Sequence, residues 1–172
     1  MLFRSPNLTV EQIRGNVETR IRKMEEGAFG GIVLANAGLT RLGLRDRITS
    51  LFGVDEMLPA AGQGIVAIEA LASNRDAIDA AKALTHEPSA LAAQCERGVL
   101  QQFGERLDCY SCIAVHATRD DGTITIRAFL SDFEATKPLR VMKSSTDAEA
   151  LIVDVARELM EQGAVELLQV KA

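Results

Sequence analysis

The sequence is poor in aromatic residues and has no tryptophan. Only 4% of its 172 residues are aromatic while 47% are hydrophobic, so aliphatic side chains must fill the core. No apolar run approaches the roughly 20 residues that span a membrane, and the apolar stretch at Met1–Phe3 is too short for a signal peptide. We also find no internal repeat and no low-complexity segment. This length and composition predict one globular domain or two small ones, without a membrane partner.

Cysteine, histidine and net positive charge are also scarce. The three cysteines have no regular spacing, which argues against a disulfide framework and fits the reducing cytoplasm. His86 and His116 lack sequence partners typical of a metal or nucleophile site, so we expect no metal and assign them no role. The net charge of −5 argues against nucleic acid as a partner. An acidic ligand would need a local cluster of arginines.

The stretch RGNVETR, which begins at residue 14, offers such a cluster. Gly15 lets the backbone approach a ligand closely. Asn16 is a good N-cap for a following helix, and the first N–H groups of that helix, up to and including that of Thr19, lack intrahelical partners. The helix dipole adds positive potential there, and a guanidinium such as that of Arg14 or Arg20 can grip a carboxylate with two hydrogen bonds. The pattern therefore predicts an anion site. A capped helix with two solvated arginines is the alternative.

A parallel βαβ unit is predicted around this motif. Its expected elements are strands at 8–13 and 31–35, with helices at 16–26, from Asn36 and at 46–52. Both strand-to-helix turns would lie at the carboxyl ends of the strands, where ligands bind in open α/β sheets. Arg41 would then converge with Arg14 and Arg20 on one cleft, unless it is only a helix-surface charge.

Residues 58–64 have the composition of a hinge that leads into a strand at 65–69. Gly62 and Gly64, with Ala67, superficially match a dinucleotide-binding fingerprint. We reject a nucleotide site, because these glycines precede a strand instead of following one. A turn into a strand is expected.

The rest of the chain predicts a compact α+β unit from about residue 84 onward. We expect helices at 74–84, at 88–103 and from Thr146 to Gly163, and strands at 111–118, 123–130 and 139–142. The last helix would begin with a capping box that joins Thr146 and Glu149. One apolar row on the helix at 88–103 makes Cys95 a core residue. The complete fold class is thus α/β, a partial βαβ domain with a parallel sheet, followed by a small α+β domain with a three-stranded antiparallel sheet.

Four sequence blocks carry a family resemblance. They are RGNVETR at 14–20, AGLTRLGL at 37–44, AAGQGIVAIE at 60–69, and IAVHA at 113–117, shortly after Cys109. In this order they resemble the hydroxymethylbilane synthases, also called porphobilinogen deaminases. The resemblance runs over nearly the whole chain but covers only the carboxyl-terminal part of the family.

The resemblance implies a part in tetrapyrrole biosynthesis, the route to porphyrins and heme. In this family a cysteine-linked dipyrromethane cofactor is extended by four porphobilinogen units, with release of ammonia, before hydroxymethylbilane is cleaved off. The matching cysteine in this chain is Cys109. The implied sites for carboxylates of the cofactor and substrate are Arg14, Gly15, Asn16, Thr19, Arg20 and Arg41, and the implied cofactor-contacting loop is Gly62, Gln63 and Gly64.

The sequence around Cys109 departs from the family pattern. Leu107 and Asp108 stand where the family has two glycines, and Cys112 takes the place of a proline. The loop from Arg97 to Cys109 is also two residues longer. Cys112 is therefore a competing thiol for cofactor attachment. A C-x-x-C pair also occurs in redox and zinc sites, but a second pair is missing here.

The resemblance divides the chain into three parts. Residues 1–58 would be a partial second domain with the anion-binding arginines, 59–83 a hinge and crossover strand of the missing first domain, and 84–172 the cofactor-carrying α+β domain. The family's catalytic aspartate lies in the missing part, so we expect no catalytic residue here. The isolated chain should be inactive, and it should self-associate through its orphan strand or pack this strand non-natively. The alternative is a non-catalytic carboxylate-binding α/β module, a degenerate or truncated relative.

Overall fold

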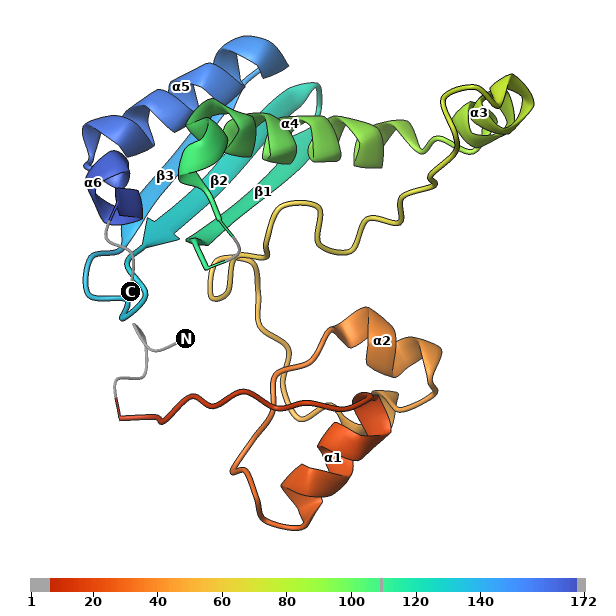
Figure 1. Ribbon diagram of the computed structural model, residues 1–172, viewed down its shortest axis with the longest axis vertical. Coiled ribbons are helices and arrows are strands. Elements are labelled where there is room, and N and C mark those ends of the chain that lie inside the picture. The colour runs from red at the N-terminus through yellow and green to blue at the C-terminus, as the bar shows by residue number, and fades with distance from the viewer. Residues whose placement is uncertain (1–6, 109, 170–172) are drawn as a thin grey trace. The chain divides into compact units, whose positions relative to one another are not determined.

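The structure, a computed structural model, describes residues 7–108 and 110–169 and divides into two compact units (Figure 1). The first unit ends at Glu56 and the second begins at Met57. Among the described residues, no helix combines the length and apolarity needed to cross a bilayer.

The described part of the first unit contains two short α-helices and one 3₁₀ turn. These are α1 (Val17–Glu25), α2 (Asn36–Arg41) and η2 (Arg45–Arg47). Ile21 of α1 and Leu39 of α2 are buried. Arg47 forms an ion pair with Glu25, which ties η2 to α1.

The two strands predicted for this unit are not formed. Residues 8–13 and 31–35 run as irregular backbone, and the described part of the first unit contains no strand. Val10 and Val33 leave 54% and 47% of their surface exposed, whereas a parallel sheet would bury such side chains. An extended segment becomes a strand only when a neighbouring segment pairs with its N–H and C=O groups. The parallel sheet is therefore not confirmed.

The helix predicted at 46–52 is also wrong. Only the single turn η2 forms, and Ile48 after it is already extended, with φ −83° and ψ 113°. Ile48 and Thr49 are both β-branched, and such side chains lose rotamer freedom in a helix. Local propensity therefore ends the helical stretch here.

The second unit contains a three-stranded antiparallel sheet, as predicted, and the strand order is β1-β2-β3. Its strands are β1 (Cys112–Asp120), β2 (Thr123–Ser131) and β3 (Leu139–Ser145). Asp121 and Gly122 join the first two strands with φ values of 44° and 80°. Positive φ at both central residues is what a two-residue hairpin of type I′ requires. The Asp-Gly signal therefore predicted this hairpin correctly.

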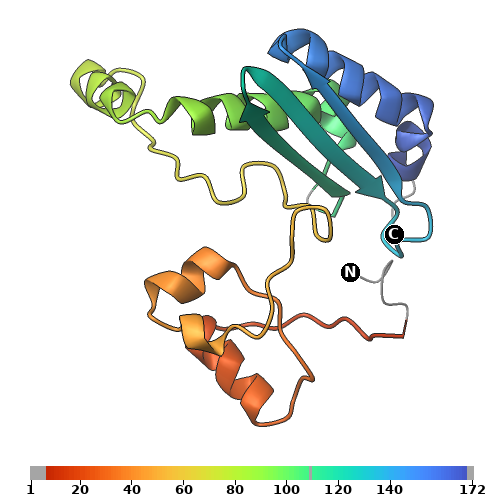
Figure 2. The same ribbon diagram turned by 180° about the vertical axis from the view of Figure 1, so that it is seen from behind.

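Helices cover one face of this sheet (Figures 1 and 2). The helices of the unit are α3 (Arg75–Ala83), α4 (Glu87–Phe103), η3 (Gly104–Arg106), α5 (Ala148–Glu161) and α6 (Ala164–Gln169). Both α4 and α5 pack on the sheet, and α6 was not predicted. The core contains Cys95, Val99 and Phe103 of the predicted apolar row, with Leu91 packed against it.

Gly98 allows α4 and α5 to approach closely. A Cβ atom at this position would lie 2.8 Å from Cδ1 of Ile152 on α5. Glycine in a helix interior costs about 1 kcal/mol relative to alanine. The close contact between the two helices explains why the chain accepts this cost.

Side-chain caps fix the starts of three helices. Asn16 and Asn74 accept hydrogen bonds from the N–H groups of Thr19 and Ala77, as expected for α1 and α3. The cap of α5 is not Thr146 but Asp147, whose Oδ1 accepts the N–H of Ala150 at 3.0 Å. Threonine and aspartate can both cap a helix, so the sequence did not decide which of these two neighbouring residues is the cap.

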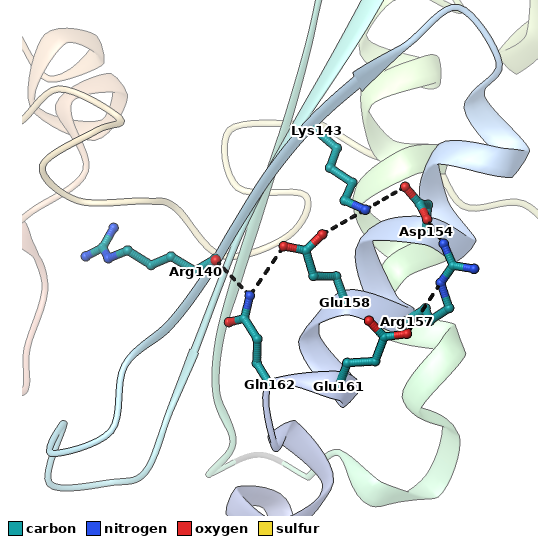
Figure 3. Close-up of polar contacts among 7 residues, drawn as sticks. All are labelled: Arg140, Lys143, Asp154, Arg157, Glu158, Glu161 and Gln162. Atoms are coloured by element: carbon teal, nitrogen blue, oxygen red, sulfur yellow. Dashed lines mark hydrogen bonds and ion pairs between the residues drawn. The ribbon is translucent and has the colours of Figure 1, made fainter.

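A cluster of charged side chains joins β3 to α5 (Figure 3). Lys143 Nζ lies 2.7 Å from a carboxylate oxygen of both Asp154 and Glu158. These hydrogen bonds raise the pKa of Lys143, and the bond from Lys143 lowers the pKa of Asp154. Arg157 also pairs with Asp154, so the cluster is held together by its own counter-charges.

Candidate functional site

The start of α1 is shaped by Gly15, Asn16 and Thr19. Gly15 has φ +126°, and a Cβ atom there would lie 2.9 Å from Cγ2 of Thr19. Only glycine therefore fits this position without strain. Asn16 Oδ1 accepts the Thr19 N–H at 2.8 Å, which satisfies one of the free donors of the helix. The free N–H groups of the first turn are therefore those of Val17 and Glu18, one fewer than predicted.

Two cations fold back onto the segment that precedes α1. Arg20 donates from Nε to the carbonyl oxygen of Gly15 at 2.7 Å, and Lys23 donates from Nζ to that of Arg14 at 3.1 Å. Arg20 makes this hydrogen bond with Nε, so its two terminal guanidinium nitrogens do not take part in the bond. Lys23 was missed in the sequence. Its spacing was the available signal, since it lies three residues after Arg20 on the same face of α1.

Arg41 lies in the last turn of a different helix, α2, and is exposed. Gly43, with φ +70°, follows the helix, and Leu44 donates its N–H to the carbonyl of Leu39 at 2.9 Å. This hydrogen bond joins the residues that follow α2 to Leu39, the buried residue of the helix. Arg41 is thus held at a fixed helix end. Its convergence with Arg14 and Arg20 stays a prediction.

The glycine-rich loop of the second unit is built from two consecutive turns. Gln63 donates to the carbonyl of Ala60 at 3.0 Å, and Ile65 donates to that of Gly62 at 3.1 Å. Gly62 and Gly64 have φ values of +75° and +84°, which favour glycine. Residues after Ile65 do not form the predicted strand. The turn was therefore predicted correctly and the strand was not.

A buried glutamate supports this loop. Glu96 on α4 is only 3% exposed, and its Oε2 accepts the N–H of Gly62 at 2.6 Å. Its Oε1 accepts the N–H of Ala117 at 2.9 Å and lies 3.3 Å from Nδ1 of His116. His116, to which the sequence assigned no role, thus has an acidic partner. Glu96 itself was missed, and its only signal was its place next to Cys95 in the apolar row.

The predicted attachment residue, Cys109, lies outside the described residues. Next to it, Asp108 accepts the N–H of Tyr110 and the hydroxyl of Ser111, both at 2.9 Å. This carboxylate stands where the family has a glycine. With Asp108 in place of a glycine, this position has less backbone freedom, and its side chain accepts hydrogen bonds from the residues that follow.

The two described cysteines are free thiols with raised pKa values. Burial is the main cause for Cys95, which is fully buried, and Glu96 adds to the effect. Burial is again the main cause for Cys112, and the charge of Asp132 adds to it. Both thiols are therefore held in the weakly nucleophilic, protonated form.

Comparisons with known proteins agree with the sequence blocks. Residues 1–79 match a family model described as "Porphobilinogen deaminase, dipyromethane cofactor binding domain". That range contains all three candidate arginines and the glycine-rich loop, and it ends before Cys109.

Several porphobilinogen deaminases are similar to the chain over nearly all its length. The proteins of Thiobacillus denitrificans, Acidithiobacillus ferrooxidans (strain ATCC 53993) and Ralstonia nicotianae are 40%, 37% and 36% identical to it. The matches cover 94%, 98% and 96% of this chain but 53%, 55% and 51% of these relatives. The chain thus spans about half the length of the curated relatives it matches. By sequence, the chain is therefore similar to about half of a porphobilinogen deaminase.

Proposed function

We propose that this chain serves in tetrapyrrole biosynthesis as about half of a hydroxymethylbilane synthase, in the stepwise polymerisation of porphobilinogen to hydroxymethylbilane. The observation that carries the proposal is the similarity to porphobilinogen deaminases over 94–98% of the chain. The dipyrromethane cofactor, when bound, would supply the pyrrole end to which further units are added. The residues of this chain would hold that cofactor and the growing chain, while the catalytic acid would come from outside it.

The start of α1 would bind the carboxylates of the pyrroles. Each pyrrole carries an acetate and a propionate, so an acidic chain needs local donors for them. Arg14, Arg20 and the free N–H groups at Val17 and Glu18 supply such donors, and the helix dipole adds to their effect. Gly15, Asn16 and Thr19 would shape this start, and Arg41 would add a third guanidinium.

Cys109 would carry the cofactor through a thioether bond. The free thiols of Cys95 and Cys112 fit a reducing cytoplasm, which is where we place the protein. Because their pKa values are raised, they are poor competitors for covalent attachment. This supports Cys109 as the thiol that reacts.

The extended segments of the chain would find their pairing partners elsewhere in a whole enzyme. Residues 8–13 and 31–35 would be parallel strands of the partial second domain, 1–58. Residues 65–69 would form a strand of the first domain, within the crossover at 59–83, and 84–172 would carry the cofactor. Exposed Val10, Val33 and Val66 support this division, because strands at these places would bury them.

Ehrlich's reagent tests the proposal, because it gives colour with an assembled dipyrromethane. The chain would be produced together with the amino-terminal part of the Thiobacillus denitrificans relative, purified and treated. We expect colour with the natural sequence and with Cys112→Ser, and none with Cys109→Ser. Absence of colour in all three proteins would favour a carboxylate-binding module without cofactor.

A further inference from the structure

Glu96 is a carboxylate placed inside the core of the second unit. It lies on α4 between Cys95 and Arg97, and only 3% of its surface is exposed. Acidic residues are almost never buried to this degree unless their oxygens are paired. Burial of an unpaired carboxylate would strongly disfavour folding. The position of Glu96 therefore has to be explained by what its two oxygens bind.

Both oxygens accept hydrogen bonds from backbone groups that are distant in the sequence. Oε2 accepts the N–H of Gly62 at 2.6 Å, and Oε1 accepts the N–H of Ala117 at 2.9 Å. Ala117 belongs to β1, an edge strand, which pairs with β2 alone in the described sheet. One side chain thus joins the glycine-rich loop, α4 and the edge of the sheet.

Besides Glu96, the contact that anchors the loop is the side chain of Ala61, which packs against the core. Its two turns, Ala60 to Gln63 and Gly62 to Ile65, are closed by hydrogen bonds within the loop. Gly62 and Gly64 have no side chains that could anchor it. The loop also forms part of the wall of a pocket of about 300 Å³, which Gln63 lines together with Cys95, Glu96 and His116. The bond from Gly62 to Glu96 therefore adds a directional hydrogen bond to the apolar contact of Ala61, and together they set how the loop faces this part of the molecule.

We infer that Glu96 is a positioning residue that clamps the Ala60–Ile65 loop onto α4 and β1. It touches backbone groups of the loop, and it holds the Gly62–Gly64 backbone in one orientation for a ligand. The effect on a pyrrole ligand rests on the proposed function, whereas the clamp itself does not. The glycine-rich loop would then move together with the α+β part of the chain.

The two-acceptor role explains why a carboxylate is needed at this position. Glutamine offers one oxygen and an NH₂ group, so one of the two backbone N–H donors would face another donor in Glu96→Gln. Loss of a hydrogen bond to a charged group predicts opening of the loop that is about ten- to a hundred-fold more frequent. Glu87→Gln is the matched control, since it makes the same charge change on an exposed residue of the same helix.

Hydrogen exchange of single amides, followed by NMR on the whole chain, tests the clamp. In the natural sequence, the Gly62 amide should exchange much more slowly than that of the exposed Gly64. In Glu96→Gln, the amide of Gly62 or that of Ala117, whichever faces the NH₂ group, should exchange about ten- to a hundred-fold faster, while Ile126 in the core stays protected. Equal exchange of Gly62 and Gly64 in the natural sequence would overturn the inference, even if the variant fails to fold. So would unchanged protection of both Gly62 and Ala117 in a folded Glu96→Gln.

Porphobilinogen, titrated into the same samples, separates the clamp from the proposed function. We expect it to shift the Gly62–Gly64 amide signals of the natural sequence and of Glu87→Gln, with weaker binding to Glu96→Gln. A protected Gly62 without any response to porphobilinogen would support the clamp and count against the proposed function at this loop. Equal affinity of all three proteins, with Gly62 released only in Glu96→Gln, would overturn the role of the clamp in ligand binding.

Discussion

The two units of the chain bury their apolar residues to very different degrees. In the second unit, the side chains of Phe103, Ile126 and Leu159 are completely buried between one face of the sheet and its helices. In the first unit, Ile21 and Leu39 are buried, while many other large apolar side chains are exposed, namely Leu8, Val10, Val33, Leu42, Leu51, Phe52 and Val54. The α+β unit therefore supplies its own core. In the first unit, the described residues leave these apolar side chains uncovered.

The same contrast occurs within the second unit. Its segment at 65–69 exposes 76% of Val66 and 58% of Ile68, although the sheet of the same unit is well packed. Exposed apolar side chains on extended backbone are typical of strands that have lost their neighbours. The comparison thus separates a part of the chain that buries its apolar residues from segments that leave them exposed.

The largest expected effect concerns catalysis. We predict that the isolated chain does not consume porphobilinogen, because the proposed catalytic acid lies outside it. Proton transfer by a positioned acid contributes about 10²- to 10⁴-fold to a rate. A porphobilinogen consumption assay, with a complete relative as the positive control, measures this. Turnover by the isolated chain at the rate of the relative would contradict the prediction.

Core substitutions test the difference in packing. Ile126→Ala should lower the free energy of unfolding of the second unit by about 2–5 kcal/mol, because it leaves a cavity in a closed core. Ile21→Ala, in the first unit, should leave that transition nearly unchanged. Urea unfolding followed by circular dichroism compares the two variants. Equal shifts of the transition would mean that the two units share one cooperative core.

Local signals predicted most of what forms in this chain. Asn16 as a cap, Asp121-Gly122 as a hairpin turn and Pro88 at the start of α4 each act through neighbouring residues, so the sequence alone identifies them. The antiparallel sheet followed from the same signals, since its strands are joined by short connections. These elements were confirmed.

Features that depend on distant residues could not be predicted in this way. The strands at 8–13 and 31–35 have the expected composition, but a strand also requires a partner, which composition does not reveal. Glu96 resembles an ordinary helix-surface residue until Gly62 and Ala117 are placed beside it. Lys23, in the last turn of α1, likewise reaches the segment before the helix through a contact with the backbone of Arg14.

The arginines of the first unit test whether its exposed helix start is a binding site. In an enzyme completed with the missing part, Arg14→Leu or Arg20→Leu should weaken binding of the primer or substrate about ten- to a hundred-fold, as expected for loss of one charge-assisted bond. Arg157→Leu is the control, because Arg157 lies in the charged cluster on α5. Binding titrations with porphobilinogen compare them. Equal losses at all three positions would indicate general destabilisation instead.

The smallest expected effect is weak self-association of the isolated chain. Apolar segments without strand partners favour pairing between chains, so the mass measured by light scattering should rise with protein concentration. Val66→Lys should reduce this rise, since a charged side chain blocks such pairing. Met142→Lys, also at an exposed apolar residue but within the formed sheet, is the matched control. A monomer at every concentration would contradict the prediction.

Mass spectrometry of the cofactor-loaded protein tests the central proposal most directly. The chain, produced in cells together with the amino-terminal part of a relative, would be measured intact and then as peptides. We predict the added mass of one dipyrromethane, located on the peptide that contains Cys109 and absent from Cys109→Ser. An adduct on Cys112, or no adduct on any cysteine, would contradict the account.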